Sequence, residues 1–99
     1  YPDTNPSYLD QLLNECNIVA CGHSHYHFMH KRHDGRFLFN PGSVGQPRER
    51  GTKGACWAYL QTEDMNVEFI QTPYSKDNLI FKAKKRDPML PYLYSVLMR

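Results

Sequence analysis

The chain has 99 residues, of which 40% are apolar and 13% aromatic, so it can fold around a core as one small domain. Its formal charge of +2 is too small to favour a specific nucleic-acid partner on electrostatic grounds. No apolar run reaches the roughly 18 residues of a membrane-spanning helix, so no membrane partner is expected. Three scattered cysteines favour a reducing, cytoplasmic location over a disulfide framework.

The first half of the chain is predicted to form a helix and three strands. A helix is predicted over 5–16, where an asparagine cap precedes a first-turn proline and apolar residues recur at helical spacing. The apolar run at 17–22 ends in glycine and is typical of a buried strand. A hairpin follows, with Asp34-Gly35 as its turn and 36–39 as its returning strand.

The second half is predicted to begin with a loop over 40–51, a segment dense in proline and glycine. Two strands follow, over 55–62 and 66–72, and we expect Trp57 and Tyr59, on one strand face, to fill the core. A helix over 75–86 ends at Asp87-Pro88, and a short helix closes the chain. This β-rich centre flanked by helices predicts an α/β layered domain, or part of one, spanning residues 1–99.

Three histidines stand at alternate positions: His23, His25 and His27. On an extended chain their side chains would point to one side, about 6.5–7 Å apart along the strand. Two such imidazoles can hold one metal ion, or one each of two ions about 3.5–4 Å apart. The alternatives are surface histidines of a loop, or a zinc knuckle shared with Cys16 and Cys21. The knuckle lacks the ligand spacings of structural zinc modules.

Two motifs in order carry a family resemblance. Gly22-His23-Ser24-His25 follows a buried strand, and a hairpin leads from it to Asn40-Pro41-Gly42-Ser43 and then Gln46-Pro47-Arg48. This arrangement resembles the calcineurin-like metallophosphoesterases, specifically their small bacterial and archaeal phosphodiesterase branch. The closing helices also look like the end of that branch, so the resemblance covers nearly the whole chain.

The resemblance implies an αββα sandwich and a phosphodiesterase or phosphatase whose dinuclear metal centre hydrolyses a phosphoester substrate. It implies that His23 ligates one divalent ion and His25 the other, and it gives His27 no ligand role. Manganese is the expected metal, with iron, zinc and nickel as alternatives. Arg48 and Asn40 are the candidate substrate-binding residues, because a guanidinium matches phosphate bidentately and the asparagine's loop should lie beside the metals. Each residue also has a purely structural alternative: Arg48 as a solvated surface charge, and Asn40 as a turn cap.

The chain departs from the family in its missing ligands. The family's Asp-x-His, Gly-Asp and Asn-His motifs and one further histidine stand earlier in its chain, and none of these dipeptide or tripeptide motifs occurs here. We therefore expect residues 1–99 to be the C-terminal portion of one metallophosphoesterase domain, whose N-terminal half is absent. Two imidazoles without carboxylates bind hard ions weakly, so the chain alone should be inactive. The missing half or a second copy of the chain is its expected partner.

Two further functional classes stay open at the level of sequence. One is a non-catalytic binding or scaffold module with the same fold, as in the retromer scaffold subunit, which looks like these enzymes. The intact His-x-His and Gln-Pro-Arg motifs favour the enzyme. The other is a small structural zinc protein, which would need zinc held in stoichiometric amount by thiolates.

Overall fold

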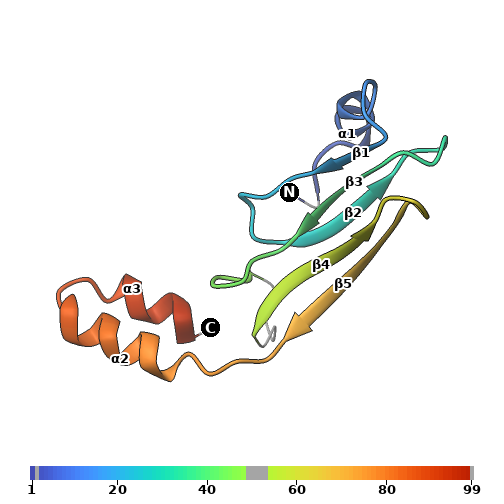
Figure 1. Cartoon of the computed structure of the whole chain (residues 1–99). Coiled ribbons are helices and arrows are strands. Elements are labelled where there is room, and N and C mark those ends of the chain that lie inside the picture. Colours follow the sequence, from blue (N-terminus) through green and yellow to red (C-terminus); the bar gives the residue numbers. More distant parts are fainter. Residues whose placement is uncertain (2, 49–53, 99) are drawn as a thin grey trace.

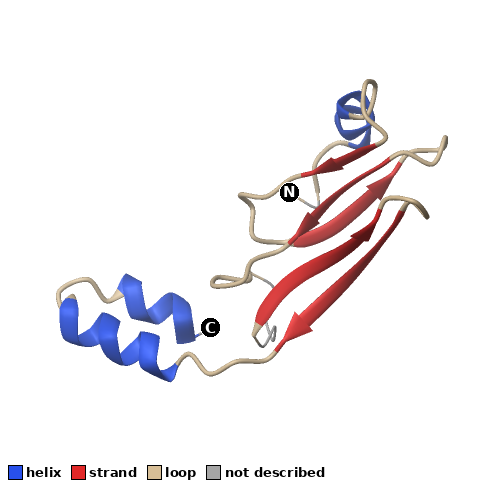
Figure 2. Ribbon diagram, viewed as in Figure 1, coloured by secondary structure: helices blue, strands red, loops and turns tan. Residues whose placement is uncertain are grey.

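The computed structural model describes residues 1, 3–48 and 54–98 (Figure 1). Its elements are α1 (Pro6–Leu12), β1 (Ile18–Ala20), β2 (His27–Lys31), β3 (Phe37–Pro41), β4 (Ala55–Gln61), β5 (Asn66–Thr72), α2 (Asp77–Arg86), α3 (Tyr92–Ser95) and the 3₁₀ helix η1 (Val96–Met98). The predicted α/β class, a β-rich centre flanked by helices, is confirmed (Figure 2). No helix in the described part of the chain is both long and apolar enough to cross a membrane.

The strands form two sheets. The three-stranded sheet has the order β1-β3-β2, with β1 parallel and β2 antiparallel to the central β3, and β4 pairs with β5 as an antiparallel hairpin. Because β1 and β3 are parallel, the segments that follow their carboxyl ends leave from the same edge of the sheet. The Gly-His-Ser-His motif follows β1, and the Gly-Ser and Gln-Pro-Arg residues follow β3. The pairing of β1 with β3 therefore brings together two motifs that are about twenty positions apart in the sequence.

Strand β3 is buried on both faces, as its central position requires. On one side Leu38 packs against Leu9 and Leu13 of the first helix and its C-cap. On the other side Phe39 meets Phe69 of β5 edge to face, with ring centroids 6.5 Å apart. The described core therefore consists of α1 against the first sheet and the second sheet against its opposite face.

Helix α1 begins as predicted and ends earlier. The Oδ1 atom of Asn5 accepts a hydrogen bond from the backbone N–H of Ser7 at 2.8 Å, and Pro6 occupies the first turn. The helix ends at Leu12 instead of continuing to residue 16. Arg36 of the hairpin explains the early end, because its Nη1 donates to the carbonyl oxygens of Leu13 and Asn14 at 2.9 and 2.8 Å.

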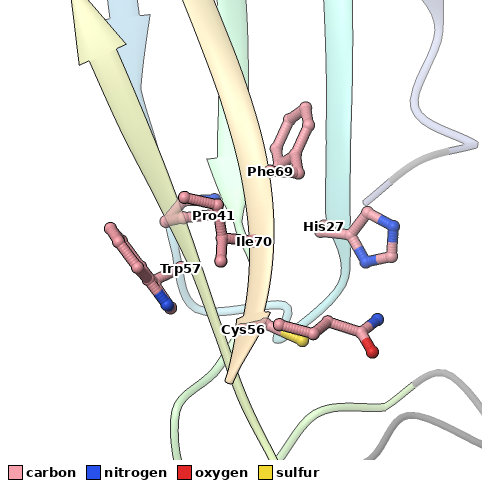
Figure 3. Close-up of a pocket in the computed structure, with 7 residues that line it drawn as sticks. His27, Pro41, Cys56, Trp57, Phe69 and Ile70 are labelled. Atoms are coloured by element: carbon pink, nitrogen blue, oxygen red, sulfur yellow. The ribbon is translucent and has the colours of Figure 1, made fainter.

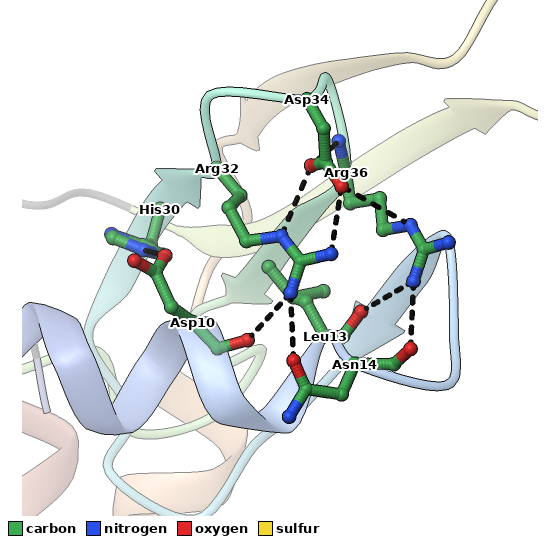
Figure 4. Close-up of polar contacts among 7 residues, drawn as sticks. All are labelled: Asp10, Leu13, Asn14, His30, Arg32, Asp34 and Arg36. Atoms are coloured by element: carbon green, nitrogen blue, oxygen red, sulfur yellow. Dashed lines mark hydrogen bonds and ion pairs between the residues drawn. The ribbon is translucent and has the colours of Figure 1, made fainter.

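Arg36 belongs to a polar clasp that ties the β2–β3 turn to the end of α1 (Figure 4). Arg32 donates from Nη1 to the Asp10 carbonyl oxygen and to Asn14 Oδ1, both at 3.0 Å. The same guanidinium forms two parallel hydrogen bonds with the Asp34 carboxylate, at 3.1 and 2.7 Å. One carboxylate thus orients the two arginines that hold the helix end.

The clasp should resist mild acid. The hydrogen bond from Arg32 holds the pKa of Asp34 well below its ordinary value of 3.8, with the Arg36 backbone N–H and the charges of both arginines adding to the shift. A lowered folded pKa means that the contribution of Asp34 to stability is full above the ordinary value and declines as pH falls below it. We expect the Asp34 carboxyl carbon, followed by NMR, to titrate well below the ordinary aspartate value. A midpoint at the ordinary value would contradict this.

One core prediction is wrong. Trp57 and Tyr59 do share a face of β4, but they are 41% and 53% exposed. The alternation of the strand turns Cys56 and Ala58 toward the first sheet, and Cys56 is only 4% exposed. The two aromatic side chains consequently lie on the outer face of the β4–β5 hairpin.

Candidate metal-binding loops

Two loops lie side by side at the carboxyl ends of β1 and β3. The histidine loop comprises residues 21–26, and the Pro-Gly loop comprises residues 42–48. Direct hydrogen bonds join them. His25 Nδ1 lies 3.1 Å from the carbonyl oxygen of Gln46, and the backbone N–H of Arg48 donates to the carbonyl oxygen of His25 at 3.4 Å. The structure therefore brings the two sequence motifs together as one unit.

Asn40 is the central support of this unit. Its side chain is 1% exposed, and its Nδ2 donates to the Gly22 carbonyl oxygen at 3.2 Å and to Ser24 Oγ at 3.1 Å. Its Oδ1 accepts from the backbone N–H of Gly42 at 2.9 Å. One buried amide thus fixes both loops, which is a positioning role. Direct contact between Asn40 and substrate stays a prediction.

The histidine loop has an unusual backbone. His23 and His25 have φ angles of 74° and 66°, in the left-handed region that side chains other than glycine seldom adopt. Each such residue costs about 1–3 kcal/mol and persists when its surroundings hold it, most often at functional sites. Ser24 between them is 3% exposed, and its hydroxyl accepts from Asn40 and from the backbone N–H of Tyr26. Ser24 supports the strained backbone from within the loop, and Asn40 supports it from β3.

This backbone corrects the extended geometry predicted for the three histidines. His23 and His25 lie in the loop before β2, with left-handed backbone, whereas His27 is the first residue of that strand. His27 faces the second sheet, with its ring centroid 5.7 Å from that of Phe69, in a pocket that Cys56 also lines (Figure 3). Strand alternation thus does not place the three on one side. That His27 is no ligand stays a prediction, for which this separate environment gives a new reason.

The tautomer of His25 suits a metal ligand. A carbonyl oxygen can only accept, so the contact with Gln46 requires Nδ1 of His25 to carry the proton. The lone pair of the neutral ring is then on Nε2. Ligating histidines generally donate their other ring N–H in this way, which fixes ring orientation and ligand basicity. His23 is exposed, and its ring is accessible from solvent.

The donor set within the described residues is incomplete. They contain no group of three or more histidine, cysteine, aspartate or glutamate side chains placed to hold one metal ion. Cys21 is close in sequence, but its Sγ donates to the Phe39 carbonyl oxygen at 3.4 Å, and burial raises the pKa of its thiol. Burial therefore favours the protonated thiol over the thiolate that binds metals. His23 and His25 fit part of a metal centre.

Arg48 lies at the rim of the same unit. Its exposed side chain lines a hollow of about 330 Å³ together with Tyr1, Asp3 and Tyr26. The predicted contact between Arg48 and a phosphate is compatible with this place and stays a prediction. Arg50, a second arginine that the sequence offers for this contact, lies outside the described residues.

Sequence reasoning missed the supports of the loops. Ser24 is the variable position of the His-x-His motif, and only its burial reveals its role. The contribution of Gln46 comes from its backbone carbonyl, which no side-chain pattern can show. The sequence did predict Asn40 as a turn cap, and the hydrogen bond that its Oδ1 accepts from the Gly42 N–H confirms this prediction.

Comparisons with known proteins agree with the two motifs. The family model described as "Calcineurin-like phosphoesterase superfamily domain" matches residues 3–65. An uncharacterized protein of Methanocaldococcus jannaschii is 31% identical over 83 residues, covering 70% of this chain and 34% of the archaeal protein. The crystal structure of a hypothetical protein from Pyrococcus horikoshii matches with a TM-score of 0.76 and 25% identity, covering 97% of this chain and 38% of that one. The chain thus spans about a third of the length of these relatives.

Proposed function

Because the chain belongs to the calcineurin-like phosphoesterase superfamily, we propose that it supplies two histidine ligands to a centre for metal-dependent phosphoester hydrolysis. The match confirms the family resemblance seen in the motifs. The observation that carries the proposal is the pair of strained histidines at a fixed loop junction, one with Nδ1 hydrogen-bonded and Nε2 left to bind. The remaining ligands would come from outside residues 1–99.

The roles of the residues follow from their contacts. His23 and His25 would each hold one of two divalent ions, manganese being the expected metal. When bound, such a pair of ions lowers the pKa of water and clamps the phosphate oxygens. Gln46 orients His25 through its carbonyl, and Asn40 holds the backbone on which both histidines stand. Arg48, exposed beside His25, would bind a phosphate oxygen of the substrate, a phosphodiester or phosphomonoester.

The proposal is tested in a protein of the relatives' length that carries this chain. We expect it to hydrolyse bis-p-nitrophenyl phosphate or p-nitrophenyl phosphate when manganese is added, and to lose that turnover with a chelator. The 99-residue chain alone should show little turnover with the same metal, because its described residues supply two ligands without a carboxylate. Metal binding without turnover by the longer protein would favour a non-catalytic module of the same fold and overturn the proposal.

A further inference from the structure

The Pro-Gly loop is held through backbone carbonyl oxygens that face three different elements. The Ser43 carbonyl oxygen accepts from a backbone N–H of β4 at 3.0 Å. The Gln46 carbonyl oxygen lies 3.1 Å from His25 Nδ1. Between these two, the Val44 carbonyl oxygen accepts from the hydroxyl of Tyr74 at 2.9 Å. The extended segment that leads from β5 to α2 (Figure 1) thus contacts the loop that orients His25.

The tip of the Pro-Gly loop consists of Val44 and Gly45, and both residues lie in a bend. Glycine gives the backbone more accessible conformations than any other residue, so the tip has little stiffness of its own. A hydrogen bond to the carbonyl group directly before this glycine is therefore an effective restraint. The Tyr74 hydroxyl supplies that bond.

The tip and Gln46 belong to one closed turn. The backbone N–H of Gln46 donates to Ser43 Oγ at 2.8 Å, so a side-chain hydrogen bond joins the two ends of a four-residue segment. When both ends of so short a segment are fixed, rotation of one peptide unit must be compensated by its neighbours. A change in the direction of the Val44 carbonyl therefore changes the direction of the Gln46 carbonyl, two peptide units further on.

Tyr74 is itself held in place by its surroundings. Pro73, directly before it, has a fixed φ. Gly54, just before β4, has a φ of 89°, and a Cβ there would overlap the carbonyl oxygen of Thr72 and the Cα of Pro73. The glycine thus lets the start of this segment lie directly against β4. Lys76 Nζ lies 5.6 Å from the centroid of the Tyr74 ring, a cation–π contact that further restricts the ring.

We propose that Tyr74 is a positioning residue of the metal centre, an inference that rests on the proposed role of His25 as a ligand. By fixing the Val44 carbonyl, its hydroxyl keeps the Gln46 carbonyl directed at His25 Nδ1. The neutral ring then keeps its proton on Nδ1 and its lone pair on Nε2, in one orientation. Without the Tyr74 bond the turn gains other conformations, the Nδ1–H loses part of its acceptor, and the ring populates its other tautomer.

Tyr74→Phe tests the proposal, because it removes the hydroxyl and keeps the ring. The test uses the protein of the relatives' length that carries this chain. In its metal-free form, at a pH above the ordinary histidine range, proton–nitrogen correlation NMR shows which ring nitrogen of His25 carries the proton. We expect Nδ1–H in the parent protein and a mixture of both tautomers in the variant.

The manganese affinity should follow the tautomer. It should fall about 3–10-fold in Tyr74→Phe, less than the 10–100-fold that loss of a group bonded directly to a ligand causes. Turnover at saturating manganese should equal that of the parent, because both histidines are still present. Incorporation of p-aminophenylalanine at position 74 puts an N–H donor in place of the hydroxyl and should restore both the tautomer and the affinity.

Trp57→Phe is the matched control. It also removes one aromatic donor, the indole N–H, whose 2.8 Å hydrogen bond goes to Thr72 Oγ1 at the end of β5 and not to the Pro-Gly loop. It should leave the His25 tautomer and the manganese affinity unchanged.

Three results would contradict the inference: a parent-like tautomer in Tyr74→Phe, the same tautomer change in Trp57→Phe, or a manganese affinity that does not follow the tautomer. Failure of the proposed function has a different signature. A parent protein that binds no manganese would refute the ligand role of His25, whereas the metal-free tautomer would still decide whether Tyr74 positions the ring.

Discussion

Replacing His25 by alanine is expected to cost the complete protein most of its metal and its turnover. The change removes the proposed ligand, and the Gln46 carbonyl loses the group that it orients. Loss of an outer-sphere partner alone lowers metal affinity or activity by about 10–100-fold, so loss of a ligand should exceed this range. The His23→Ala variant should lose metal and turnover in the same way. Metal content by mass spectrometry, alongside initial rates at fixed manganese, measures both effects.

His27→Ala is the matched control, because it also replaces a histidine by alanine, and His27 is only four positions from His23 and two from His25. His27 faces Phe69 in the second sheet, so its loss should lower stability and leave the metal content intact. A second control separates ligation from backbone strain. His23→Gly relieves the left-handed φ of 74° and should raise the stability of the metal-free protein while still losing metal. Loss of metal in the His27 variant alone would refute the ligand assignment.

Asn40→Ala should destabilise the protein and loosen the histidine loop. It removes two donated hydrogen bonds and one accepted bond, and leaves Gly22 O, Ser24 Oγ and the Gly42 N–H inside the structure without this partner. A buried polar group left unsatisfied costs about 1–3 kcal/mol, so the total should be about 2–4 kcal/mol after partial relaxation. Urea unfolding at equilibrium, followed by circular dichroism, measures the loss.

The metal response distinguishes the positioning role from ligation. Asn40→Ala should keep both histidines, so high manganese concentrations should restore part of its activity, unlike that of His25→Ala. Ser43→Ala is the milder comparison, because it removes one hydrogen bond, from the Gln46 N–H to Ser43 Oγ at 2.8 Å. If Asn40→Ala matched Ser43→Ala in both stability and metal affinity, the central place given to Asn40 would be wrong.

Local patterns predicted the elements well, because each had a chemical signal within a few residues. The Asp34-Gly35 turn, the Asn5 cap and the alternation of β4 need no distant partner. The early end of α1 needed Arg36, about twenty positions away, to take the last carbonyl groups. The exposure of Trp57 and Tyr59 depended on which face of β4 meets the first sheet, a choice that the alternation alone leaves open.

The sequence predicted which residues form the candidate site, but it did not predict the conformation of their backbone. Its two histidines and the Asn40 turn could be named from their motifs. The left-handed backbone could not be predicted, because it is held by tertiary hydrogen bonds that Asn40 donates and that the Gln46 carbonyl oxygen accepts. An extended histidine run would have placed the three rings on one side, whereas the left-handed backbone at His23 and His25 leaves His27 in an environment of its own.

The segment that leads from β5 into α2 is tied to the Pro-Gly loop, because the Tyr74 hydroxyl donates to the Val44 carbonyl oxygen at 2.9 Å. That loop also carries Gln46, whose backbone carbonyl oxygen contacts His25 Nδ1. The docking of Tyr74 and the orientation of the His25 ring therefore depend on one loop, and a shared element makes two equilibria interdependent. Whatever factor the proposed metal adds to the docking of Tyr74 on this loop, that docking must add to the affinity for the metal.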